Sequence, residues 1–335
     1  MNGEMWGVHF LGRGRISLDR MPIPEPKDQD VLVQIKVAGI CGTDRENLLG
    51  SGQTVVPGHE NAGVVAATDK ALRLKVGDRV GINCHITCRR CEYCLRGDLY
   101  FCPELKVVGF DIDGGFAEYA LIPEPCCMFL PADISFDAGS LLMDVFGTAY
   151  RGVKQGRPLP GDQVAVWGAG PIGLAAMLTA KHLGAQVASI DFNQHRLETA
   201  RNLGAQLVLN PGREDVVAAL MEWTAGRGLD IAYECVGNEQ AALQALSALR
   251  KRGRLGVIGV SDHLTINPWE QLIRRELSLY GSRNFTLPEF DEMVSIVRHG
   301  LPVEKIISHR FPMDQAADAF EVFRSGECEK VTLVA

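Results

Sequence analysis

Five cysteines crowd the stretch CHITCRRCEYCLRGDLYFC, residues 84 to 102. Four of them follow the spacing Cys88-x2-Cys91-x2-Cys94-x7-Cys102. Thiolates two residues apart on a turn converge on one tetrahedral ion, and a fourth from a short lobe completes its shell. Four cysteine ligands leave no position for water or substrate, so the spacing predicts a structural zinc. The alternatives are free structural thiols, or a register in which the spare Cys84 replaces Cys88.

A second set of metal-binding residue types lies upstream, in GICGTD (39–44) and VVPGHENAGVV (55–65). Cys41, His59 and Glu60 offer one sulfur, one imidazole and one carboxylate. Catalytic zinc sites typically use three protein ligands and keep one position for water or substrate. A histidine beside a glutamate is also common as a hydrogen-bonded surface pair, so these residues alone leave both interpretations open.

The glycine motif Gly168-Ala-Gly170-Pro-Ile-Gly173 lies between the apolar run QVAVW and the helical pattern LAAMLTAKHLG. Glycines there allow a tight turn and let a pyrophosphate approach the N-terminus of the helix. The next predicted strand ends in Asp191, whose carboxylate suits the adenosine ribose hydroxyls and repels a 2′-phosphate. NAD is therefore favoured over NADP, although the guanidinium of Arg196 could tolerate that phosphate. A tight turn in an α/β domain without nucleotide is the alternative.

The elements that must position these residues change character along the chain. Residues 29 to 125 contain short alternating apolar runs broken by Gly and Pro, which predict the strands of a barrel-like β unit. From about residue 160, strand and helix patterns alternate, which predicts a parallel sheet covered by helices on both faces. The segment GVKQGRPLPGD (152–162) is predicted to be a junction. The expected fold class is therefore α/β plus β.

Composition and charge exclude several classes of partner. The 335-residue chain is 46% hydrophobic and 22% charged, as in globular proteins, and carries a formal net charge of −7. Nucleic acids and acidic membranes require basic patches, so we expect neither as a partner. The N-terminal MNGEMWGVHFLGRGR lacks the layout of a signal peptide, and this favours metal ligands over disulfides for the ten cysteines. We expect a cytoplasmic protein.

Taken in order, GICGTD, PGHE, the four-cysteine lobe, DGGFAEY (113–119), GAGPIG and ECVG (234–237) resemble the zinc-dependent medium-chain dehydrogenases. The resemblance covers essentially the whole chain, and the family includes alcohol, sorbitol and threonine dehydrogenases. It implies a GroES-like catalytic domain at residues 1–150, completed by about 290–335, and a Rossmann coenzyme domain at 151–289. It also implies two zinc ions per chain, NAD as coenzyme, and a homodimer or homotetramer joined through the Rossmann sheet edges.

The same resemblance assigns roles at the catalytic zinc. Cys41 and His59 match the first two ligands, and Glu60 matches the acid that binds or swaps onto the metal. In LLMDVFGTAYRG (141–152), Asp144 stands where liver-type alcohol dehydrogenases have a cysteine, as in the branch of the family that uses aspartate. A carboxylate ligand still suits zinc, so the resemblance implies a complete site.

Proton release is a second departure from the family pattern. Thr43 matches the hydroxyl that starts the family's proton relay, and Glu46 replaces the histidine often found five residues past the cysteine. The relay then runs through Glu46, or through the ribose and water, or is truncated. The implied reaction is hydride transfer between NAD(H) and a secondary alcohol or ketone, activated by zinc as a Lewis acid.

The implied coenzyme site extends beyond the glycine motif. It comprises Gly168, Gly170, Pro171, Ile172, Gly173, Asp191, Arg196, Val236, Ile258, Gly259, Val260, Leu279 and Tyr280. Two alternatives stay open for the function: a catalytically silent nucleotide-binding relative, and an NADPH-dependent ketone or aldehyde reductase. A zinc-free quinone reductase shares the fold but lacks GHE and the cysteine lobe.

The expected substrate is a polyol, a sugar or an amino alcohol. Glu46, Asp111 and Asp113 could place acidic groups around the substrate, which suits hydroxyl-rich or amine-bearing molecules. Phe110 and Phe285 could equally line an apolar slot. Acidic side chains are mostly exposed, so solvated loop residues are the alternative for the three acids.

Overall fold

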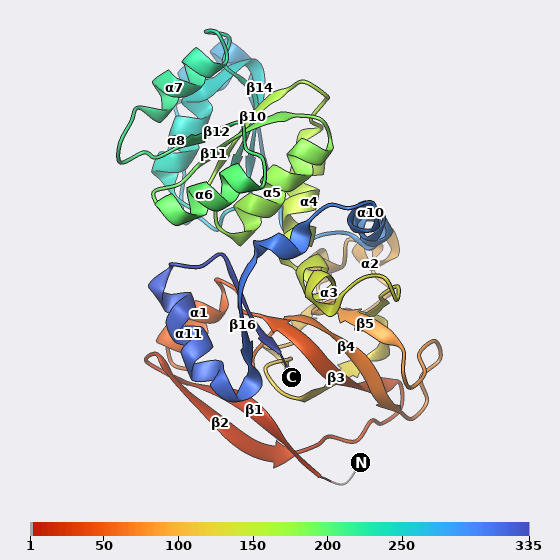
Figure 1. The fold of residues 1–335 in the computed structure, drawn as a ribbon. Coiled ribbons are helices and arrows are strands. Elements are labelled where there is room, and N and C mark those ends of the chain that lie inside the picture. Colours follow the sequence, from red (N-terminus) through yellow and green to blue (C-terminus); the bar gives the residue numbers. More distant parts are fainter. Residues whose placement is uncertain (1–2, 335) are drawn as a thin grey trace. The chain divides into compact units, whose positions relative to one another are not determined.

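The computed structural model describes residues 3–334, which form two compact units. The first unit runs up to Asp144 and also contains Thr286–Gly300 and the segment from Ile307 onward. The second unit comprises Val145–Phe285 and Leu301–Ile306. Figure 1 shows the elements of both. No helix within residues 3–334 is long and apolar enough to cross a bilayer.

The first unit is built around a seven-stranded sheet with the order β16-β17-β3-β4-β5-β9, in which β8 also pairs with β3. Two small hairpins, β1–β2 and β6–β7, complete its strands. The strands are β1 (Glu4–Gly12), β2 (Arg15–Pro22), β3 (Asp30–Gly39), β4 (Glu60–Thr68), β5 (Arg79–Ile82), β6 (His85–Ile86), β7 (Lys106–Val107), β8 (Tyr119–Pro123), β9 (Cys127–Phe129), β16 (Ile307–Pro312) and β17 (Lys330–Val334).

The register of three neighbouring strands in this sheet decides where the candidate site forms. β3 pairs antiparallel with both β4 and β17, with Gly39 opposite Glu60 on one side and Thr332 on the other. The end of β3 therefore lies between the first residue of β4 and a strand from the extreme C-terminus. Segments nearly 300 residues apart in the chain are therefore adjacent here.

A large apolar core fills the interior around the main sheet of the first unit. Inward-facing residues of β3, such as Val31, Val33 and Ile35, are fully buried in it. The rings of Phe10, Phe116 and Phe320 meet there in tilted and edge-on contacts. Aromatic pairs prefer such arrangements to a face-to-face sandwich. The helices of this unit are α1 (Asp44–Leu49), α2 (Glu92–Arg96), η1 (Leu99–Phe101), η2 (Glu124–Cys126), α3 (Phe136–Met143), α10 (Leu287–Arg298), η5 (Met313–Gln315) and α11 (Ala316–Ser325).

The second unit is a six-stranded parallel sheet with the order β12-β11-β10-β13-β14-β15. Its strands are β10 (Gln163–Trp167), β11 (Gln186–Ile190), β12 (Leu207–Leu209), β13 (Leu229–Glu234), β14 (Leu249–Val257) and β15 (Ser278–Gly281). The chain runs outward from β10 in one direction and then returns to β13 on the other side, so the strand order reverses beside β10. Ligands bind at the carboxyl ends of parallel strands around such a reversal.

Helices cover the sheet of the second unit and begin at residues suited to helix starts. Asn193 and Asn238 accept hydrogen bonds from the first backbone N–H groups of α6 and α8, and Pro171 opens α5. The helices are α4 (Val145–Gly156), α5 (Pro171–His182), α6 (Gln194–Asn202), α7 (Val216–Trp223), α8 (Glu239–Ala248), α9 (Pro268–Gln271), η3 (Ile273–Arg275) and η4 (Val303–Ile306).

The predicted junction at residues 152–162 is partly helical in the structure. Residues 152–156 form the last turn of α4, which belongs to the second unit. Gly152 is needed inside this helix because a Cβ there would collide with the side chain of Ile258. Its glycine therefore reflects close packing rather than a break, and this is the reason the sequence pattern was misleading at this place.

Candidate metal centres and coenzyme pocket

Four residues predicted as ligands of a catalytic zinc lie together in the first unit. One ligand atom each of Cys41, His59, Glu60 and Asp144 lies within 4.8 Å of the other three. Cys41 follows the end of β3, His59 and Glu60 stand at the start of β4, and Asp144 follows α3. The pairing of β3 with β4 places Gly39 opposite Glu60, and this register brings the first three together.

The donor atoms of this group face one another. Asp144 Oδ2 lies 3.6 Å from Cys41 Sγ and 3.5 Å from His59 Nε2. Thr43 Oγ1 lies 3.4 Å from the same imidazole nitrogen. Sulfur, imidazole nitrogen and carboxylate oxygen at such separations match the donor set that zinc takes in proteins. The four side chains therefore fit a zinc ion, which they would hold through Cys41, His59 and Asp144, with Glu60 beside them.

Asp44 supports two of these candidate ligands and was missed by sequence reasoning. Its side chain is 2% exposed, and its Oδ1 lies 3.4 Å from His59 Nδ1. Its Oδ2 accepts a hydrogen bond of 2.8 Å from the backbone N–H of Cys41. A carboxylate on the far nitrogen of a ligating histidine fixes the ring and directs the other nitrogen to the metal. The signal was available in GICGTD, where Asp44 follows Cys41 by three residues.

The ionisable side chains around Cys41 and His59 favour a bound cation. Burial raises the pKa of the Cys41 thiol, and the neighbouring Asp144 and Glu60 carboxylates raise it further. Burial lowers the pKa of His59, but Asp44 and Asp144 outweigh it and hold that pKa well above its usual value. Both shifts come in part from carboxylates gathered around a thiol and an imidazole. A divalent ion at this point would supply that charge to three acidic groups and a thiol.

Glu60 has a partner that the sequence did not indicate. Burial raises the pKa of Glu60 to about 7, and the ammonium of Lys330 opposes that rise. Lys330 Nζ forms an ion pair with Glu60 Oε2 and donates a 2.8 Å hydrogen bond to the carbonyl of Ile40. Both side chains are fully buried. Lys330 lies at the start of β17, so only the sheet register reveals it.

The two residues predicted for proton release differ in their surroundings. Thr43 precedes α1 and its hydroxyl lies beside His59, as given above. Glu46 is exposed on α1. Asp111 and Asp113 accept hydrogen bonds from the backbone N–H groups of Val107 and Val56, so they brace loops. Their roles in substrate binding and Glu46's role in the relay stay predictions.

Phe110 borders the candidate metal centre. The centroids of the Phe110 and His59 rings are 5.2 Å apart, and Phe110 is 37% exposed. Its ring therefore offers an apolar surface next to a candidate ligand. Phe285, the other aromatic residue considered for an apolar slot, is buried in the second unit.

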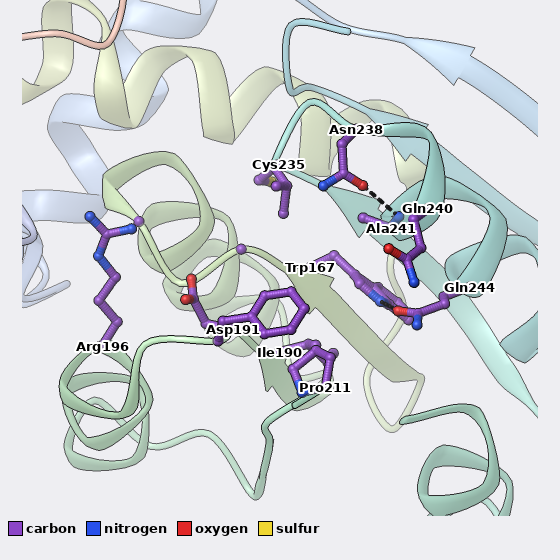
Figure 2. A pocket seen from close by; sticks show the side chains of 14 residues that line it. Trp167, Ile190, Asp191, Arg196, Pro211, Cys235, Asn238, Gln240, Ala241 and Gln244 are labelled. Atoms are coloured by element: carbon purple, nitrogen blue, oxygen red, sulfur yellow. Dashed lines mark hydrogen bonds between the residues drawn. The ribbon is translucent and has the colours of Figure 1, made fainter. Parts of the chain in front are cut away.

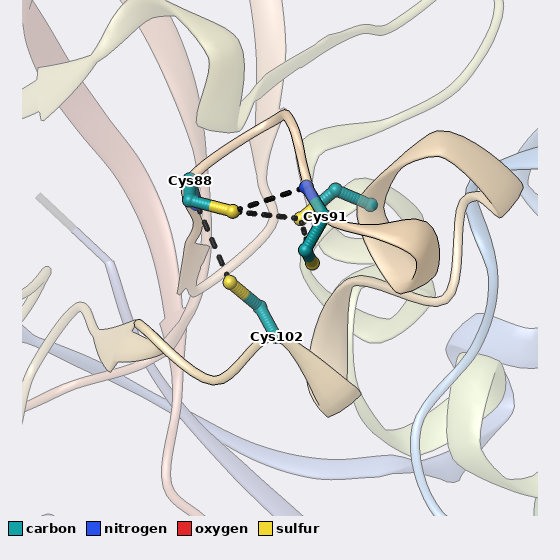
Figure 3. Close-up of side chains that lie close together, drawn as sticks. Cys88, Cys91 and Cys102 are labelled. Carbon is teal, nitrogen blue, oxygen red and sulfur yellow. Dashed lines mark hydrogen bonds between the residues drawn. The ribbon is translucent and has the colours of Figure 1, made fainter.

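The four cysteines of the lobe also converge, and Figure 3 labels three of them, Cys88, Cys91 and Cys102. The sulfur atoms of these three and of Cys94 lie within 4.8 Å of one another, and the Cys91–Cys94 separation is 3.4 Å. Backbone N–H groups of Cys91 and Cys88 point at the sulfurs of Cys88 and Cys102, each at 3.4 Å. Such donors favour thiolates, and a hydrogen bond from the Arg90 N–H is the main reason that the pKa of Cys88 falls to about 6. The set fits a closed, structural zinc.

Cys84 lies outside this group. It is buried, and the groups formed by metal-binding side chains among residues 3–334 do not include it. Burial raises the pKa of its thiol to about 12, so it favours the neutral thiol. The geometry therefore favours Cys88, and not Cys84, as the first cysteine of the set.

The second unit contains a cavity of about 270 Å³ at the carboxyl ends of β10, β11 and β13 (Figure 2). Five residues of the predicted coenzyme site line it: Gly168, Gly170, Asp191, Arg196 and Val236. Gly168 has φ +93°, which favours glycine, and Gly173 carries no Cβ because one would collide with the Gly168 carbonyl. The glycine motif thus forms the tight turn that a dinucleotide requires.

Asp191 is held in place by the turn that it borders. Its carboxylate accepts hydrogen bonds of 2.7 Å from the Ala169 N–H and 2.8 Å from the Asn193 N–H. The carboxylate oxygens keep further lone pairs, which can accept hydrogen bonds from ribose hydroxyls. Arg196 lines the same cavity, and Figure 2 shows both side chains at the same end of it.

Other lining residues were not predicted from the sequence. They are Trp167, Ile190, Phe192, Pro211, Cys235, Asn238, Gln240, Ala241 and Gln244. Most lie at strand ends or on the first turns of α8, and a rule that ligands lie at carboxyl ends of strands would have found several. Pro171, Ile172, Gly173, Ile258, Gly259, Val260, Leu279 and Tyr280 do not line this cavity. Tyr280 instead donates a hydrogen bond to the Gly152 carbonyl.

Comparison with known proteins places both units in known domain families. Residues 27–132 match the alcohol dehydrogenase GroES-like domain, and residues 171–299 match the zinc-binding dehydrogenase domain. L-threonine 3-dehydrogenase of Chromobacterium violaceum is 35% identical over 330 residues, which cover 95% of this chain and 96% of that protein.

Solved structures of dehydrogenases have the same fold as this chain. The alcohol dehydrogenase of Thermus sp. ATN1 superposes with a TM-score of 0.92 at 32% identity, covering 98% of this chain and 99% of that one. A zinc-binding dehydrogenase of Sinorhizobium meliloti 1021, bound to NADP, gives a TM-score of 0.91 at 29% identity, covering 99% and 100%.

These matches confirm the expected fold class, a GroES-like domain and a Rossmann domain, and they confirm an oxidoreductase that uses zinc and a nicotinamide coenzyme. The substrate is accordingly a small-molecule alcohol or its carbonyl product. Because both domain families match and the threonine dehydrogenase aligns over 95% of this chain, the protein belongs to the zinc-dependent medium-chain dehydrogenase family.

Proposed function

We propose that the chain oxidises a secondary alcohol at a zinc ion held by Cys41, His59 and Asp144. The observation that carries this proposal is the convergence of four zinc-type ligand atoms within 4.8 Å, from three separated segments of the first unit. Zinc bound there supplies Lewis-acid activation of the substrate hydroxyl, and the nicotinamide coenzyme supplies the hydride acceptor.

The protein's own residues orient the site and manage the proton. Asp44 fixes the imidazole of His59 and the backbone of Cys41, so the donor atoms are held ready for the metal. Thr43 Oγ1 lies beside the ligand set and is placed to accept the proton that the substrate hydroxyl loses. Its exposed position lets Thr43 release its own hydroxyl proton to solvent, with or without Glu46.

We propose an amino alcohol of the threonine type as the substrate, with polyols as the second class. Support comes from the C. violaceum relative, which is an L-threonine 3-dehydrogenase. The Phe110 ring beside His59 provides an apolar surface that suits the short carbon chain of such a substrate. The test is an initial-rate screen of threonine, polyols, sugars and simple secondary alcohols, before and after zinc removal. Oxidation of none of them by the zinc-loaded protein would favour the catalytically silent alternative.

We propose NAD as the preferred coenzyme, because the Asp191 carboxylate lines the cavity and repels a 2′-phosphate. Arg196 is the specific reason to test the alternative, since it lines the same cavity and the S. meliloti relative binds NADP. Comparison of kcat/KM for NAD and NADP decides between them. A large preference for NADP would favour the reductase alternative.

We further propose that the first unit acts as the catalytic domain and the second as the coenzyme domain. The bounds expected from the sequence, 1–150 with about 290–335 and 151–289, differ from the two units by a few residues and by the segment Leu301–Ile306. A cytoplasmic homodimer or homotetramer is the proposed state. β15 lies at an edge of the second unit's sheet, and Trp269, Ile273 and Leu279 near it are exposed apolar residues. Such an edge is suited to pairing with a second copy. Light scattering on the purified protein measures the mass; a monomer would contradict this part.

A further inference from the structure

A lysine is fully buried next to the candidate metal centre. Lys330, at the start of β17, is 1% exposed, although lysine is among the residues least often buried. Its ammonium is paired with the Glu60 carboxylate and donates to the carbonyl of Ile40, the residue before Cys41. The lysine therefore contacts both segments that carry candidate ligands, the end of β3 and the start of β4.

Glu60 is placed between two sites that attract its charge. One of its oxygens, Oε2, contacts the ammonium of Lys330. A Glu60 oxygen also lies within 4.8 Å of the ligand atoms of Cys41, His59 and Asp144. A metal ion held by those three residues and the ammonium of Lys330 would thus compete for the same carboxylate.

The backbone beside the pair is shaped to accommodate it. A Cβ at Gly39 would collide with Glu60 Oε2 and would approach Lys330 Cε to 2.8 Å. Gly39 lies opposite Glu60 in the register of β3 and β4. Only glycine leaves room for the carboxylate and the ammonium to meet at this position, so the contact is built into the sheet.

We propose that Lys330 is a positioning residue that holds the Glu60 carboxylate away from the catalytic metal and so keeps one coordination position open for the substrate. This inference rests on the proposed function, because it needs a zinc ion at Cys41, His59 and Asp144. A catalytic zinc needs an open position, whereas a permanent fourth protein ligand produces a closed, structural site. Loss of the lysine charge would remove the cation that opposes the attraction of Glu60 to a metal ion at those three ligands.

The test compares zinc release and turnover in Lys330→Met with the wild type. Release is followed with the chromogenic chelator 4-(2-pyridylazo)resorcinol, and the phase that is absent in His59→Ala identifies the catalytic zinc. We expect release of this zinc to become slower, and kcat to fall about 10-fold or more, while NADH binding is unchanged. Lys330→Arg, which keeps the charge, should behave like the wild type.

Glu60→Gln combined with Lys330→Met is the matched control. If Lys330 acts through Glu60, this double variant should release zinc at the same rate as Glu60→Gln alone. Should Lys330→Met not fold, Lys330→Gln takes its place in the comparison, because glutamine loses the charge but keeps a donor for the Ile40 carbonyl.

Two results would overturn the inference. Unchanged or faster zinc release in Lys330→Met would show that the lysine supports the sheet and does not restrain Glu60. A difference between the double variant and Glu60→Gln would show that Lys330 acts by another route. Absence of the His59-dependent zinc phase from the wild type would overturn the proposed function itself, and the inference with it.

Discussion

At the scale of single residues, the candidate metal centre depends on side chains that do not contact the metal. Asp44 bonds the Cys41 backbone with one oxygen and lies beside His59 Nδ1 with the other. Lys330 takes up the charge of Glu60. These two residues set the orientation and charge of three candidate ligands. The arrangement of Cys41, His59 and Asp144 therefore also depends on neighbouring side chains that are not themselves ligands.

Replacing Asp44 by Asn should weaken the catalytic zinc and leave the lobe's zinc in place. The amide has one acceptor oxygen where the carboxylate has two, and it lacks the charge that holds His59. Zinc affinity at this site, or kcat/KM, should fall about 10–100-fold. Competition with a chelator measures the affinity. Asp19→Asn, an exposed acid on β2, is the control, and equal effects of the two would contradict this role.

Asp191→Ala should change coenzyme preference. The variant loses the hydrogen bonds to the ribose hydroxyls and the repulsion of a 2′-phosphate, so KM for NAD should rise and the NAD-to-NADP ratio of kcat/KM should fall. The backbone donors of Ala169 and Asn193 also lose their acceptor, so thermal stability is measured alongside. A ratio that does not change would show that Arg196 and the other lining residues set the preference.

At the scale of elements, the cysteine lobe is too small to be held by its apolar contacts alone. Its buried residues are Cys94, Leu99 and Cys102, with partly buried residues such as Leu105 and Leu287 against them. Leu287 belongs to α10, and its N–H bonds the Gly97 carbonyl at the end of α2. The lobe thus packs against a helix from a late segment of the same unit, and a metal is the natural source of its rigidity.

Cys94→Ser should remove the lobe's zinc and destabilise the first unit, while the His59-dependent zinc stays bound. Serine is a poor zinc ligand and the three remaining thiolates leave the tetrahedron open. Metal analysis and thermal unfolding measure both effects. Cys84→Ser is the matched control, since it removes a buried thiol outside the set. Loss of the lobe's zinc in the control would support the register in which Cys84 replaces Cys88.

In the second unit, the charged side chain of Asp230 on β13 accepts hydrogen bonds from two arginines and from a backbone group of the neighbouring strand. Burial disfavours its charged form, but hydrogen bonds from Arg227, Arg250 and the Gln163 N–H outweigh this and lower its pKa to about 2. A carboxyl whose pKa is lower in the folded state stabilises the protein above its unfolded-state pKa. That stabilisation is lost as pH falls from about 4 toward 2.

Asp230→Asn should therefore be less stable than the wild type at neutral pH, by on the order of 1–2 kcal/mol. The difference should be constant between about pH 5 and 8 and shrink below about pH 4. Urea unfolding followed by tryptophan fluorescence suits this test, because Trp167, Trp223 and Trp269 all lie in the second unit. A difference that grows on acidification would contradict the assigned charge.

At the scale of the whole molecule, local patterns predicted the two kinds of fold, and the family resemblance and the long-range register supplied the rest. Strand–glycine–helix order and alternating apolar runs are local, so they predict a parallel α/β sheet and a barrel-like β unit, whereas the GroES-like fold and Asp144 as a ligand came from the resemblance. Lys330 is different, because it meets Ile40 and Glu60 only through the pairing of β17 with β3. The lining residues on α8 likewise depend on where β13 lies in the sheet. No spacing in the chain encodes either.

The proposed function depends on one zinc ion bound by Cys41, His59 and Asp144. The most direct measurement is the zinc content of wild type, His59→Ala and Asp144→Ala, taken with NAD reduction and the NADH dissociation constant, with Asp133→Ala as a surface control. We predict two zinc ions in the wild type and one in each site variant, with oxidation reduced to background and NADH binding intact. Alcohol oxidation that persists after this zinc has demonstrably been removed would contradict a zinc-dependent mechanism.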